Sequence, residues 1–152
     1  MNENNYMDLA IKQAKRAATL NEVPIGAVLL DYRSKELLSA RHNETLIKAN
    51  PLKHAEILVI EDACKLKKSR YLVNTIIFVT LEPCAMCAAA ISEARIEKIY
   101  FGAYDEKKGA IENGPRIYNQ ENYFKPEIYG GIKEKECYQL LKNFFSSIRD
   151  FN

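Results

Sequence analysis

The sequence has no long apolar run. Its longest apolar stretches, residues 76–79 and 88–91, are far shorter than the roughly 20 residues that a helix needs to cross a bilayer. The N-terminal residues 1–10 are polar and contain no basic segment followed by an apolar core, so no secretory signal is expected. We therefore expect a cytoplasmic protein that does not contact the membrane.

The sequence also has little excess charge of either sign. Its 22 Lys and Arg residues nearly balance its 20 Asp and Glu residues, which leaves a net charge of +2. A protein that coats nucleic acid is strongly basic, so this class is excluded. A local basic patch on a nearly neutral protein can still bind phosphates, and RNA binding therefore remains open.

Cysteine is scarce, and internal repeats and Gly/Ser linkers are absent. Four cysteines in a chain of 152 residues do not suggest a disulfide framework when no leader is present. A C-x-x-C pair in this setting indicates metal binding or redox chemistry instead. The composition is typical of a globular protein, and the length predicts a single domain over residues 1–152.

Segments typical of helices and strands alternate along the chain. Apolar residues at helical spacing predict helices over residues 6–20, 54–66 and 133–149. Apolar or β-branched runs predict strands over residues 25–30, 37–41, 75–80 and 96–101. We expect Pro24 to end the first helix, Pro83 to lie in the first turn of another helix that reaches about residue 94, and Gly102 to end the last strand. This alternation predicts a layered α/β domain with a partly parallel sheet.

The first candidate for chemistry is the segment 83–87, which reads Pro-Cys-Ala-Met-Cys. Two cysteines three residues apart on a helix lie on one face and can bind one ion as thiolates. The N-terminus of a helix favours negative charge and therefore lowers the cost of deprotonating Cys84 and Cys87. Taken alone, such a pair could equally be a redox site or a chance occurrence.

The second candidate is His54-Ala55-Glu56. Residues two apart in a helix interior point in nearly opposite directions, so His54 and Glu56 can serve one site only at the open end of a helix. We expect Asn50 and Pro51 to begin this helix. Two helix N-termini, one from each motif, would then converge on one metal ion.

His54, Cys84 and Cys87 together provide three metal ligands. A structural zinc site is normally closed by four protein ligands, whereas a catalytic site keeps one position for water. Glu56 needs no contact with the metal and can move the protons of that water. The combination of H-x-E with P-C-x-x-C is typical of zinc deaminases, so we predict a zinc-dependent hydrolytic deaminase that acts on a nucleobase.

With these motifs, the chain resembles the cytidine deaminase-like superfamily and, within it, the bacterial tRNA-specific adenosine deaminases. The resemblance covers nearly the whole chain: residues 21–28 resemble the first strand of the family, residues 42–44 its substrate-contacting turn, and residues 81–88 its second metal motif. It implies a three-layer α/β/α fold with a five-stranded mixed sheet. It also implies a homodimer with active sites near the subunit interface.

The resemblance further implies the substrate, which would be the wobble adenosine of a tRNA anticodon loop, converted to inosine. Asn43 would hydrogen-bond the flipped base, Pro24 and Ile25 would help to form the wall of its pocket, and Ala55 would be a further substrate contact. Family members often carry Thr-Gly-Ala-x-Gly-Ser in a region near the substrate where residues 107–115 of this chain read KKGAIENGP.

Two other functions are compatible with the motifs. The first is a deaminase of a free base or nucleotide (guanine, cytosine or deoxycytidylate), because such enzymes share the metal motif. The second is a non-catalytic zinc module that binds RNA or a protein partner, with His42, Cys64 or Cys137 as a fourth ligand. Glu56 argues against this module, because a closed structural site has no use for that carboxylate.

Overall fold

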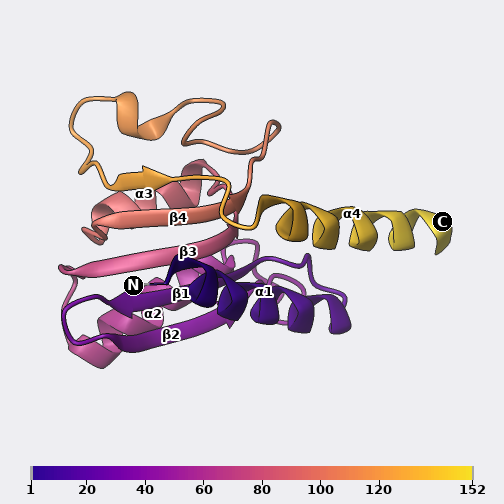
Figure 1. Ribbon diagram of the computed structural model, residues 1–152, viewed down its shortest axis with the longest axis horizontal. Helices are drawn as coiled ribbons and strands as arrows, with labels where there is room; N and C mark the ends of the chain where they lie inside the picture. The colour runs from indigo at the N-terminus through magenta and orange to yellow at the C-terminus, as the bar shows by residue number, and fades with distance from the viewer. Residues whose placement is uncertain (1, 152) are drawn as a thin grey trace.

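The computed structural model describes residues 2–151 and contains a five-stranded sheet with helices on both faces (Figure 1). The strands are β1 (Gly26–Asp31), β2 (Glu36–His42), β3 (Thr75–Leu81), β4 (Lys98–Ala103) and β5 (Glu127–Tyr129), in the order β2-β1-β3-β4-β5. β1 is antiparallel to β2 and β3, whereas β3, β4 and β5 are parallel to one another. The mixed five-stranded sheet implied by the family resemblance is therefore confirmed.

Four α-helices complete the layers: α1 (Glu3–Thr19), α2 (Ala55–Lys67), α3 (Ala85–Glu93) and α4 (Glu134–Phe151). α2 and α3 pack on one face of the sheet, and α1 with the start of α4 packs on the other. A central strand covered on both faces is apolar at successive positions, as β1 illustrates. Its residues Ala27 and Leu29 face α2 and α3, while Val28 and Leu30 face α1. None of the helices in residues 2–151 has the length and hydropathy of a membrane span.

Three predicted helix boundaries were wrong. α1 ends at Thr19, and the chain leaves it through Asn21 at φ 61°, so Pro24 does not end it. Asparagine adopts this left-handed conformation more readily than most residues, which is why the helix ends earlier. His54 and Cys84 are themselves the N-caps of α2 and α3. Asn50 and Pro51 therefore precede α2, and Pro83 precedes α3, outside the helices.

Gly102 lies inside β4 and does not end it. A Cβ atom at this position would lie 2.7 Å from the carbonyl oxygen of Thr80 and would collide with the thiol of Cys137 on α4. Glycine inside a strand often marks such a close approach of another element. Gly102 therefore allows α4 to pack directly on the sheet.

Gly102→Ala is expected to destabilise the fold by about 1–3 kcal/mol, the usual cost of forcing an extra methyl group into a packed core. Denaturant unfolding measures this change in the free energy of unfolding. An unchanged unfolding midpoint would show that α4 does not depend on this close contact.

The predicted last helix is confirmed, but its apolar side is only partly covered. Cys137 is buried, with 1% of its surface exposed, whereas Phe145 is 46% exposed. α4 projects beyond the sheet, so its C-terminal half has little of the protein beneath it (Figure 1). Helical spacing of apolar residues predicts a helix but does not identify what covers it.

β5 was not located from the sequence, because three residues are too few to show a periodic pattern.

Candidate zinc centre and active site

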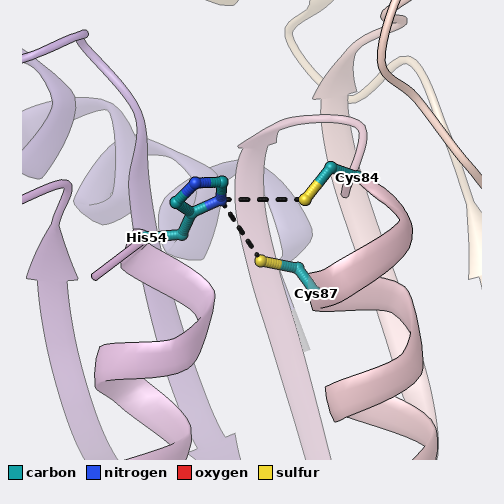
Figure 2. Close-up of side chains that lie close together, drawn as sticks. All are labelled: His54, Cys84 and Cys87. Atoms are coloured by element: carbon teal, nitrogen blue, oxygen red, sulfur yellow. Dashed lines mark hydrogen bonds between the residues drawn. The ribbon is translucent and has the colours of Figure 1, made fainter. Parts of the chain in front are cut away.

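The N-termini of α2 and α3 meet at one end of the sheet and bring the two sequence motifs together (Figure 2). His54 is the N-cap of α2, Cys84 is the N-cap of α3, and Cys87 lies in the first turn of α3. The Nδ1 atom of His54 lies 3.7 Å from Sγ of Cys84 and 3.5 Å from Sγ of Cys87. The expected convergence of two helix N-termini is therefore observed.

These distances fit a zinc ion. Tetrahedral zinc with typical Zn–N and Zn–S bond lengths holds a nitrogen and a sulfur ligand about 3.6 Å apart. The three ligand atoms all lie within 4.8 Å of one another, and no fourth His, Cys, Asp or Glu of the described chain joins them. Three ligands leave one position of the tetrahedron for water, as in a catalytic site.

The proposed fourth ligands of a closed site are engaged elsewhere. Nδ1 of His42 lies 2.8 Å from the backbone oxygen of Asn43, within hydrogen-bond distance. Cys137 lies on the opposite face of the sheet, packed with α1, and Cys64 packs at the edge of the α2–α3 core. The geometry of the described chain therefore does not support a closed structural zinc site.

The electrostatics of the centre are consistent with this donor set. The hydrogen bond from Cys87 lowers the pKa of Cys84 to about 4, while the same contact raises the pKa of Cys87. The hydrogen bond to Cys84 also raises the pKa of His54. Because zinc binds both cysteines as thiolates, metal binding would release the proton of Cys87.

Glu56 is enclosed beside this centre, with 4% of its surface exposed. Burial raises the pKa of its carboxyl group to about 7. A buried ionisable side chain with a shifted pKa next to a candidate metal centre is typical of an active site. A purely structural zinc site would not require the buried carboxyl group of Glu56.

Among the residues predicted to contact the substrate, Asn43 links Ile25 to Ala55, the residue after His54. Asn43 is buried; its Oδ1 accepts the backbone N–H of Ala55 at 2.9 Å, and its own backbone N–H donates to Ile25 at 3.1 Å. The side-chain NH₂ of Asn43 does not take part in these bonds. Pro24 is buried and Ile25 is half-buried. The roles of Asn43, Pro24, Ile25 and Ala55 in substrate binding stay predictions.

Sequence reasoning missed two buried carboxylates, Glu22 and Glu82. Glu22 accepts the backbone N–H groups of Leu46 and Ile47 and the hydroxyl of Thr45, so it holds the loop that follows Asn43. Glu82 holds a second loop beside Cys84. In the sequence, the local signal is that Glu22 and Glu82 stand just before Pro24 and Pro83. The hydrogen-bond partners of both glutamates lie more than 20 residues away along the chain.

The comparisons with known proteins agree with this geometry. Residues 1–103 match the family model of the cytidine and deoxycytidylate deaminase zinc-binding region. The fold and the three-ligand centre define the chain as a zinc-binding hydrolytic deaminase of this class.

Relatives place the chain more closely. The tRNA-specific adenosine deaminase of Rickettsia bellii is 46% identical over 142 residues, covering 93% of this chain and 98% of that protein. A structure from a study of A-to-I editing by tRNA:A34 deaminases at the wobble position of transfer RNA is 42% identical with a TM-score of 0.86, covering 90% of this chain and 99% of that one. The chain belongs to the tRNA-specific adenosine deaminase family. A guanine deaminase from Nitrosomonas europaea shares the fold alone, with a TM-score of 0.80 at 18% identity and 94% and 84% of the two chains covered.

Proposed function

We propose that this protein hydrolyses the exocyclic amino group of the wobble adenosine in a tRNA anticodon loop and leaves inosine. The observation that carries the proposal is an open three-ligand centre of His54, Cys84 and Cys87 beside buried Glu56. The choice of adenosine in tRNA is supported by 46% identity to a tRNA-specific adenosine deaminase over nearly the full length of both chains.

Glu56 is the proposed proton carrier. Zinc held by His54, Cys84 and Cys87 supplies the Lewis acidity that makes a water molecule nucleophilic near neutral pH. Glu56 takes one proton from the attacking water and passes it to the ring nitrogen. It then takes the second proton from the hydroxyl group newly formed on the ring carbon and delivers it to the departing amino group, so that the carbonyl forms and ammonia leaves. Because Glu56 is shielded from bulk solvent, the transferred proton stays within the site.

Asn43 is the proposed hydrogen-bond donor to the flipped base. Its Oδ1 is held by the N–H of Ala55, which fixes the orientation of the amide and directs its NH₂ group to another acceptor. Ala55 would contact the base through atoms other than this N–H. Pro24 and Ile25 are proposed to form part of the pocket wall, next to the backbone bond between Ile25 and Asn43.

We also propose that residues 1–152 act as a single domain within a cytoplasmic homodimer. The exposed apolar side chains on α4, including Phe145 and Ile148, provide surface that a second copy could cover. Sedimentation equilibrium measures the molecular mass in solution, and a monomer at micromolar concentration would reject the dimer.

A substrate comparison tests the proposed function. The zinc-loaded protein is incubated with an anticodon stem-loop that carries the wobble adenosine and, separately, with guanine, cytosine and deoxycytidylate. We expect inosine at the wobble position and no ammonia from the small molecules. Ammonia from a free base or nucleotide, with none from the stem-loop, would favour the free-base or nucleotide deaminase. No ammonia from any of them would favour a non-catalytic module.

A further inference from the structure

A buried carboxylate organises the loop that follows β4. Glu82 comes directly after β3 and is 2% exposed. Its Oε2 accepts the backbone N–H groups of Ile111, Glu112 and Asn113 at 3.1, 2.9 and 3.1 Å. Its Oε1 accepts the backbone N–H of Asp105 at 3.1 Å and the side-chain NH₂ of Asn113 at 2.8 Å. One side chain thus receives five hydrogen bonds from residues 105–113, which we term the 105–113 loop.

The same loop is bonded to the segment that carries Cys84. The backbone N–H of Ala110 donates to the carbonyl oxygen of Pro83 at 3.0 Å, and Gly109 pairs with Cys84 in an isolated antiparallel bridge. A Cβ atom on Gly109 would lie 2.5 Å from Cδ of Glu82, so the loop lies directly on the carboxylate. Glu82 and Cys84 are therefore linked through the 105–113 loop as well as along the chain.

Cys84 depends on such support more than Cys87 does. Cys87 lies in the first turn of α3, where helical dihedral angles set its backbone. Cys84 is the N-cap, with extended dihedral angles of φ −72° and ψ 175°, and its side chain makes no capping hydrogen bond. The position of its sulfur therefore follows the backbone of residues 83–84, which the 105–113 loop holds.

We infer that Glu82 is a positioning residue, which clamps the 105–113 loop against Pro83 and Cys84 and so keeps the sulfur of Cys84 in place to hold the metal. The inference goes beyond the proposed function and rests on the proposed role of Cys84 as a zinc ligand. Groups that orient a metal ligand typically alter metal affinity by about 10–100-fold when they are removed. Zinc retention is therefore the appropriate measurement.

Glu82→Gln is the main test variant. An amide keeps the size of the side chain but replaces one acceptor oxygen with an NH₂ group, which would face N–H donors of the loop. We expect zinc transfer from the loaded protein to a coloured chelator to become about tenfold faster. We also expect the amides of Ile111, Glu112 and Asn113 to lose protection in hydrogen exchange. Asn113→Ala removes one of the five donors and should change both measurements in the same direction but less, which keeps the test available if Glu82→Gln folds poorly.

Asp31→Asn is the matched control. Asp31 is a mostly buried carboxylate that accepts the loop N–H groups of Arg33 and Ser34, but it pairs with Thr75 at the opposite end of β3. We expect this variant to release zinc at the parental rate. Equal acceleration by both acid-to-amide changes would overturn the inference, because zinc loss would then follow general stability. Parental zinc release by Glu82→Gln and Asn113→Ala would overturn it as well.

A Cys84→Ala variant tests the proposed role of Cys84 as a zinc ligand separately from the inference about Glu82. If Cys84→Ala kept zinc as firmly as the parent, the proposed ligand set would be wrong and the clamp would have no ligand to position. Chelator transfer and hydrogen exchange use no nucleic acid. A protein that failed to deaminate tRNA would therefore leave the evidence on Glu82 unaffected.

Discussion

Glu56→Gln is expected to reduce deamination by about 10²–10⁴-fold, the usual contribution of a general acid–base group, while zinc stays bound. Glutamine keeps the size of the side chain but cannot take a proton from water or deliver one to the base. None of the three proposed metal ligands is changed, so the metal content should not fall. Single-turnover formation of inosine measures the rate, and elemental analysis of the same sample measures the zinc.

The matched control for this substitution is Glu61→Gln, on the same helix. Glu61 is exposed and pairs with Lys53 at 3.0 Å on the surface, so its loss should leave both the rate and the metal content unchanged. Near-parental deamination by zinc-loaded Glu56→Gln would show that another group carries the proton. Parallel loss of zinc would mean that Glu56 supports the metal instead.

Cys87→Ala is expected to remove zinc, activity and part of the stability together. Cys87 is fully buried and is one of the three proposed ligands, so only two would remain. Because zinc binds the folded state, its binding free energy adds to the free energy of unfolding. Added zinc should therefore raise the melting temperature of the parent but not that of Cys87→Ala. Thermal unfolding with and without zinc measures the difference.

Cys137→Ala is the control for losing a buried thiol. Cys137 packs against α1 on the opposite face of the sheet from the metal centre. Its replacement should cost about 1 kcal/mol of unfolding free energy, as core substitutions often do, and should leave zinc binding intact. If Cys87→Ala bound zinc with parental stoichiometry, the centre would have a different ligand set.

The sequence patterns predicted much of the fold, for reasons that are local. Strands β1 and β3 appear as uninterrupted apolar runs because helices cover both of their faces. α1 and α4 appear as apolar residues at helical spacing. Boundaries were less predictable: Pro83 and Gly102 were assigned to helix and strand ends by their usual preferences, whereas packing and capping determined their actual positions.

The sequence by itself determined the chemistry of the zinc centre. One imidazole, two thiols and one carboxyl group in two short motifs limit which metal can bind and how many ligands it has, because these properties belong to the side chains themselves. Only the tertiary structure decided how the centre is supported. The hydrogen bonds of Glu82 join residues 23 to 31 positions apart, and the bond from Ala55 to Asn43 spans 12. Such contacts form only after the sheet and both helix N-termini are in place, so no local pattern of residues could reveal them.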